Sequence, residues 1–100
     1  MSIEYVREKF WQAIRVLVSG GSIQHRLEHA AIALHVLQPE DIPARQRDEF
    51  VEVWDTLTKH DPEIQGEGSI RASIRKLSED EASDIGRKIF DMYIAIRGGI

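Results

Sequence analysis

Apolar residues recur along most of this chain with the spacing of one face of an α-helix. Four such stretches are separated by Gly20-Gly21, by a joint between Pro39 and Pro43, and by a connection that contains Gly66 and Gly68. A helix with one apolar face must bury that face against another element. The pattern therefore predicts four helices that pack together.

The first two helices are predicted on either side of the glycine pair. The first runs from about Ser2, a suitable N-cap, to Val18, and Gly20-Gly21 ends it because glycine accepts the left-handed conformation common after a helix. Ser22 then caps the second helix. Their apolar stripes are Ile3, Val6, Phe10, Ala13, Ile14 and Leu17 in the first, and Ile23, Leu27, Ala30, Ala31, Leu34 and Leu37 in the second.

The third helix is predicted from about Pro43 to Lys59, since proline is favourable in a first turn, and Asp61-Pro62 closes it. Its stripe includes Trp54, which we expect to be a buried anchor. The other members of the stripe are Phe50, Val53 and Leu57.

Two further helices follow the glycine-containing connection. Apolar residues at i, i+4 and i+7 predict a short helix near residues 69–77. Ser78 and Glu81 then have the spacing of a capping box, in which each side chain accepts a bond from the other's backbone. We expect Gly98-Gly99 to end the last helix, whose stripe is Ala82, Ile85, Ile89, Met92, Tyr93 and Ile96.

These elements predict an all-α fold in a single domain that spans residues 1–100. Short joints near residues 20 and 40 make successive helices antiparallel neighbours. We therefore expect a four-helix, mainly antiparallel bundle with a short additional helix near residues 69–77.

The composition is that of a folded globular chain, with 42% apolar and 30% charged residues. The absence of cysteine excludes disulfides and thiolate chemistry, and the apolar runs are too short to span a membrane. The first residues lack the basic and then apolar layout of a signal peptide. We expect a cytoplasmic protein with no membrane partner and no cofactor.

Charge is distributed unevenly around a formal net value of −4. Residues 39–68 hold nine acidic and three basic residues, whereas residues 69–76 hold Arg71, Arg75 and Lys76 with no acid. These three cations could bind an anion such as phosphate, or an acidic partner surface. We favour the interpretation that they balance the acidic third helix.

The residues His25, Glu28 and His29 follow an H-x-x-E-H pattern. In inverted zinc proteases this spacing places two histidines one helical turn apart on the metal, while the glutamate activates a water molecule. A third ligand is needed, and His60 or Asp61 would have to approach. We expect a solvated histidine pair without a metal ion, and a metal-dependent hydrolase is the least favoured function.

A nucleic-acid-binding regulator is the main rival function, because two helices joined by Gly20-Gly21-Ser22 could form a helix-turn-helix. That motif needs a small residue where its helices meet, but Val16 and Leu17 are bulky there. The available cations are Arg26, Arg71 and Arg75. We therefore expect an ordinary helical hairpin, and nucleic acid is an unlikely partner.

A second apolar stripe distinguishes the second helix from one that is buried on a single side. Ile32 and Val36 follow His25 and His29 nearly opposite the core stripe. Phe90 and Ile94 are apolar residues that likewise lie outside the core stripe of the last helix. Trp11 lies at the edge of the first stripe. Aligned exposed apolar residues indicate an interface. The sequence thus predicts a non-enzymatic protein–protein interaction or regulatory module, most simply a homodimer.

Overall fold

The computed structural model describes residues 2–98, which contain five α-helices, one short 3-10 helix and no strand. About 71% of these described residues are helical, which confirms the all-α prediction. The elements are α1 (Ile3–Leu17), α2 (Ile23–Leu34), η1 (Pro39–Asp41), α3 (Ala44–Leu57), α4 (Ser69–Arg75) and α5 (Glu79–Ile96).

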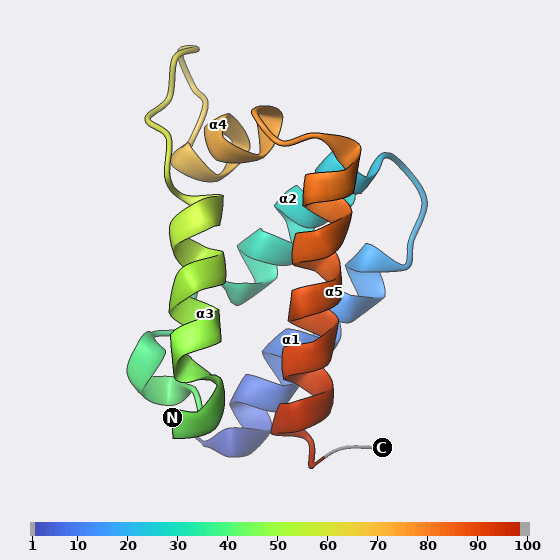
Figure 1. Cartoon of the computed structure of the whole chain (residues 1–100), viewed down its shortest axis with the longest axis vertical. Helices are drawn as coiled ribbons and strands as arrows, with labels where there is room; N and C mark the ends of the chain where they lie inside the picture. The colour runs from blue at the N-terminus through green and yellow to red at the C-terminus, as the bar shows by residue number, and fades with distance from the viewer. Residues whose placement is uncertain (1, 99–100) are drawn as a thin grey trace.

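The helices form two antiparallel pairs (Figure 1). α3 and α5 run side by side in opposite directions, and α1 and α2 form a hairpin that crosses behind them in this view. α5 is the central element, since it packs against α1, α2 and α3, while α4 covers one end against α2 and α3. Because α2 runs back along α1, the pair is the helical hairpin that we expected.

Serine caps set the beginnings of three helices. The Ser2 and Ser22 hydroxyls accept bonds from the backbone N–H groups of Tyr5 and His25 at 3.3 and 3.1 Å. Before α5, the Ser78 Oγ accepts the Glu81 N–H at 3.1 Å, and the Glu81 carboxylate accepts the Ser78 N–H at 2.9 Å. These bonds satisfy donors that have no partner within the helix, as the sequence predicted.

Glycine follows the C-cap directly at the end of α5, where Gly98 comes after Arg97, whereas α1 already ends at its C-cap Val18, three residues before Gly21. Gly21 has φ 103° and Gly98 has φ 100°, values in the left-handed region that other residues rarely adopt. Gly99, predicted as part of the last stop signal, lies outside the described residues.

The proline joint contains more structure than the sequence predicted. Its backbone forms η1, and the Arg47 side chain from α3 donates to the carbonyls of Pro39 and Ile42, each at 2.9 Å. Ile42 is fully buried, although it lies in no predicted stripe. The joint is therefore an anchored part of the core.

The core lies where the two helix pairs meet, and Phe10 of α1 approaches Phe50 of α3 with ring centroids 6.3 Å apart. Trp54 stacks on Phe50 but is only half-buried, so the prediction of a buried anchor was wrong. Its position is at the edge of α3 next to a small pocket that also contains His35. α3 also ends at Leu57, two residues earlier than predicted.

Candidate interaction surface

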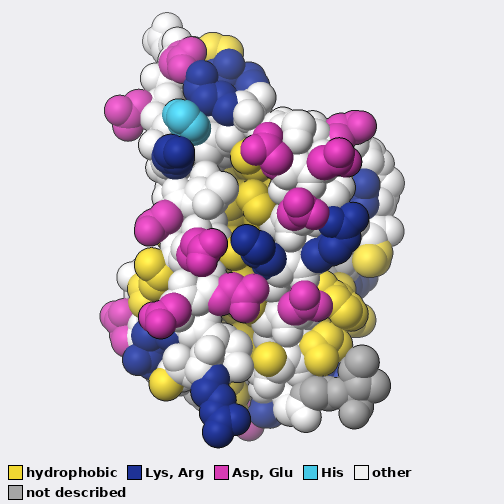
Figure 2. All heavy atoms as spheres, viewed as in Figure 1, with side chains coloured by type: hydrophobic (Ala, Val, Ile, Leu, Met, Phe, Trp, Pro, Cys, Tyr) yellow, Lys and Arg dark blue, Asp and Glu magenta, His cyan; other side chains and the backbone are white. Residues whose placement is uncertain are grey.

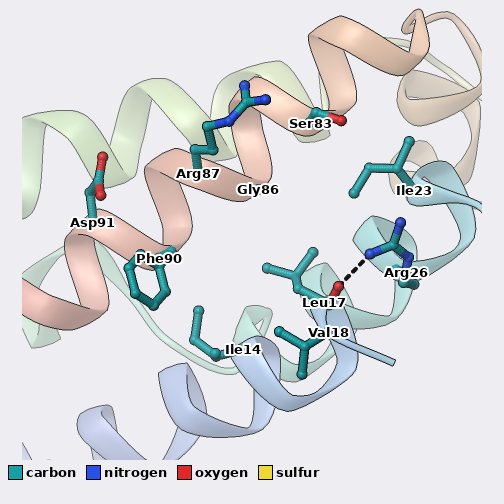
Figure 3. Close-up of a pocket in the computed structure, with 10 residues that line it drawn as sticks. All are labelled: Ile14, Leu17, Val18, Ile23, Arg26, Ser83, Gly86, Arg87, Phe90 and Asp91. Carbon is teal, nitrogen blue, oxygen red and sulfur yellow. Dashed lines mark hydrogen bonds between the residues drawn. The ribbon is translucent and has the colours of Figure 1, made fainter. Parts of the chain in front are cut away.

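An open groove of about 540 Å³ lies between the end of α1, the start of α2 and the middle of α5 (Figure 3). In this view Phe90 of α5 points toward Ile14 of α1, and Val18 lies beside them. Arg87 and Asp91 follow the edge of α5 on the side away from α1. The apolar lining consists of Ile14, Leu17, Val18, Ile23, Gly86 and Phe90.

Gly86 leaves space at the floor of the groove. It is buried in the middle of α5, where a Cβ atom would lie 3.7 Å from Leu17 Cδ2 and 3.9 Å from Ile23 Cδ1. Both distances are ordinary van der Waals contacts, so the site has room for a methyl group. The glycine therefore adds depth to the groove and is not required by a close approach of the hairpin.

Arg26 holds the wall of the groove in place. Its guanidinium donates to the carbonyl of Leu17 at 2.5 Å (Figure 3). It also donates to the carbonyl of Gly21 at 3.1 Å. The carbonyl of Leu17 is at the end of α1 and has no partner within the helix, and a cation there also suits the helix dipole; the carbonyl of Gly21 lies in the turn before α2. Arg26, a candidate nucleic-acid contact in the sequence, is thus engaged in bracing the α1–α2 turn.

Large apolar side chains remain exposed beside the groove. Trp11 is 49% exposed, Val18 78% and Phe90 46%. Trp11 lies against Tyr93 with ring centroids 6.1 Å apart, and Ile94 is half-buried one turn after Phe90. Figure 2 shows hydrophobic side chains gathered over the lower half of α5 and the end of α1. We call the groove together with Trp11, Tyr93 and Ile94 the α1–α5 surface.

The structure separates the five predicted interface residues into two groups. Trp11, Phe90 and Ile94 belong to the α1–α5 surface. Ile32 and Val36 are 47% and 36% exposed on α2 and just after it, but neither lines the groove. The second stripe of α2 is therefore exposed, yet it does not line the groove.

Several residues of this surface were not singled out in the sequence. Val18, Gly86, Arg87 and Asp91 all line the groove. Two signals were present: an apolar residue directly before a glycine turn, and a glycine within a strong helical pattern. Neither signal shows by itself that the two segments meet.

The H-x-x-E-H residues share one side of α2, where the glutamate is paired with a cation of α4. The rings of His25 and His29 lie 4.5 Å apart between centroids. Glu28 forms two bonds with the Arg71 guanidinium, at 3.1 and 2.9 Å, and the hydrogen bond to Arg71 holds the pKa of Glu28 below its ordinary value. Within residues 2–98, no three His, Cys, Asp or Glu side chains are grouped so that they could hold a metal ion.

The three candidate anion-binding cations are each paired with an acid of the chain itself. Arg71 binds Glu28 of α2, as described above. Arg75 binds Glu67 at 3.0 Å, and Lys76 binds Glu63 at 2.9 Å, so that hydrogen bonds from these cations lower the pKa of both carboxyls. The expectation that these cations balance the third helix was wrong, because their partners lie on α2 and on the connection before α4.

Comparisons of the chain with protein-family models, with curated proteins and with solved structures find no match. Among the described residues, every helix is too short or too polar to cross a membrane.

Proposed function

We propose that this chain is a small, non-enzymatic protein–protein interaction module that binds its partner through the α1–α5 surface. The observation that carries the proposal is the grouping of the exposed side chains of Trp11, Phe90 and Val18 around an open apolar groove. Scattered apolar residues on a surface are ordinary, but a contiguous group with charged residues at its edge is typical of a binding site.

The groove also has a rigid frame. Arg26 fixes the turn that forms one wall, and α5, which packs against three helices, forms the other. A preformed site loses little conformational entropy on binding. Aromatic side chains such as Trp11 and Phe90 are the residues that most often dominate binding energy in interfaces.

The contacts of the cations favour this function over nucleic-acid binding. Arg26, Arg71 and Arg75 each bond to groups of the chain itself, and binding phosphates would require these bonds to break. The acidic residues Glu28 and Glu67 would then be left beside the bound phosphate. This arrangement opposes the electrostatic attraction on which most nucleic-acid binding depends.

Site-specific cross-linking in the cells that express the protein tests the proposal. The photoreactive residue benzoylphenylalanine would replace Val18, which is the most exposed apolar residue of the groove and should tolerate the change. A matched control places it at Glu49, on the exposed side of α3. We expect one discrete cross-linked product from position 18 and none from position 49. Equal labelling from both positions, or none from position 18, would contradict the proposal.

A further inference from the structure

The outward side of α5 carries a pattern of charges that is complementary to itself. Arg87 and Asp91 have opposite charges, lie one helical turn apart, and both line the groove. At 3.6 residues per turn, these two residues together with Phe90 and Ile94 fall within an arc of about 100°. One face of a single helix therefore holds a cation, an anion and, at its edge toward α1, an exposed aromatic ring.

This pattern selects one arrangement of two identical helices. In an antiparallel pair related by a two-fold axis, Arg87 can face Asp91 of the partner subunit, and the same axis produces the reciprocal contact. The axis then passes at the level of residue 89, and the two Phe90 positions are offset by about 3 Å along the helices, so the rings can meet. A parallel pair would place Arg87 beside Arg87 of the partner subunit, which is repulsive.

We propose that the partner of the α1–α5 surface is a second copy of this chain, bound across a two-fold axis with the α5 helices antiparallel and Arg87 paired with Asp91 of the partner subunit. This inference rests on the proposed function and names the partner of the same site. The charges set the orientation of the two copies, and the apolar residues Phe90 and Ile94, with Val18 nearby, supply the buried area.

The contacts within one copy leave Arg87 and Asp91 available for ion pairs with the partner subunit. Asp91 forms no ion pair with any residue from 2 to 98, so it is available to an incoming cation. Arg87 pairs with Asp84, but both side chains are exposed, at 71% and 66%. An exposed pair between residues three apart contributes little and can be replaced.

Charge reversal tests the arrangement directly. Arg87→Asp places acids on both sides of each contact, and Asp91→Arg places cations there. We expect each variant alone to associate at least about tenfold more weakly than the wild type in sedimentation experiments. An equimolar mixture of the two variants restores both contacts with opposite charges, and we expect a heterodimer within about threefold of the wild-type affinity. The double variant should also regain self-association.

Lys88→Asp is the matched control, because it makes the same charge change at the next residue. Lys88 faces Glu52 of α3, at 3.8 Å, and we expect no change in association. Circular dichroism would verify that each variant is folded, and a variant that does not fold is replaced by Arg87→Gln or Asp91→Asn. These neutral variants should show a smaller weakening, because they remove the attraction without adding a repulsion, and no rescue on mixing.

Three results would overturn the inference. The first is a wild type that remains monomeric at about 200 µM, well above the concentrations at which specific dimers usually form. The second is folded single variants that associate like the wild type, and the third is a mixture that fails to recover. The mass of the product cross-linked at position 18 separates this inference from the proposed function. A product of twice the chain mass supports both, whereas a different protein supports the function and refutes the second copy.

Discussion

Replacing Gly86 with alanine should stabilise the fold and fill the floor of the groove at the same time. Within a helix, alanine is favoured over glycine by about 1 kcal/mol. Burying one additional methyl group contributes up to about 0.8 kcal/mol. The Cβ would lie 3.7 Å from Leu17 and 3.9 Å from Ile23, so no overpacking opposes these gains. We expect the free energy of unfolding to rise by about 1–2 kcal/mol.

Urea denaturation followed by circular dichroism measures this change. It should be performed at low protein concentration, where association does not contribute to the apparent stability. The midpoint of thermal unfolding should rise by about 4 °C or more for a chain of this size. Sedimentation of the same variant should show weaker self-association, because the groove has become shallower.

Two other glycines provide controls, because replacing them with alanine should change the free energy of unfolding differently. Gly21 has φ 103°, and a Cβ atom there would lie 3.4 Å from His25 Cδ2, so Gly21→Ala should destabilise the fold by about 1–2 kcal/mol, mainly through backbone strain. Gly20 has no positive φ and nothing within 4 Å of a built Cβ, so Gly20→Ala should be close to neutral. If Gly86→Ala lowers stability by more than about 0.5 kcal/mol, α5 and the hairpin pack more closely than described here, and our account of the groove floor is wrong.

Four further changes test the core, the cap, the ion pair and the histidine pair. Ile89→Ala should cost about 2–5 kcal/mol in urea denaturation because the side chain is fully buried, and a cost under about 1 kcal/mol would contradict the described core. Ser78→Ala should cost about 0.5–2 kcal/mol by removing the cap of α5, and a neutral result would mean that α4 and α5 are one continuous helix. The pKa of Glu28 is lowered by its hydrogen bond to Arg71, so the stability from this pair is present above the pKa of the unfolded carboxyl and is lost as the pH falls through the lower folded value. Glu28→Gln should therefore reduce the loss of unfolding free energy that the wild type shows at acidic pH. If the variant loses as much stability as the wild type at acidic pH, the assignment of this loss to the Glu28–Arg71 pair is wrong. The purified protein should carry no stoichiometric zinc, and His25→Ala should leave the thermal midpoint within about two degrees; one zinc per chain that this substitution removes would show a metal site.

The helices could be predicted from the sequence because their signals are local. The stripe of α5 and the capping box at Ser78 depend only on residues within a few positions of each other, and the structure confirms both. The same holds for Ser22 and for the glycine turn before it. Local periodicity was therefore sufficient for the fold class.

Features that depend on distant residues could not be predicted in this way. Arg71 binds Glu28, which is 43 positions away, so the pairing of the cations was assigned to the wrong helix. Ile42 is buried because the joint folds back onto the core, and periodicity does not extend into joints. The groove forms only where the end of α1 approaches the middle of α5. The sequence identified Trp11, Phe90 and Ile94 as exposed apolar residues, but it also added Ile32 and Val36, which lie elsewhere.

Sedimentation velocity of the wild-type protein from about 1 to 200 µM measures whether the chain binds a second copy of itself. If the α1–α5 surface binds a second copy, the weight-average mass should rise with concentration from that of the 11.4 kDa chain toward twice that value. The rise should disappear in Arg87→Asp and return when this variant is mixed with Asp91→Arg. A wild-type mass that stays at that of one chain over the whole range would contradict the claim.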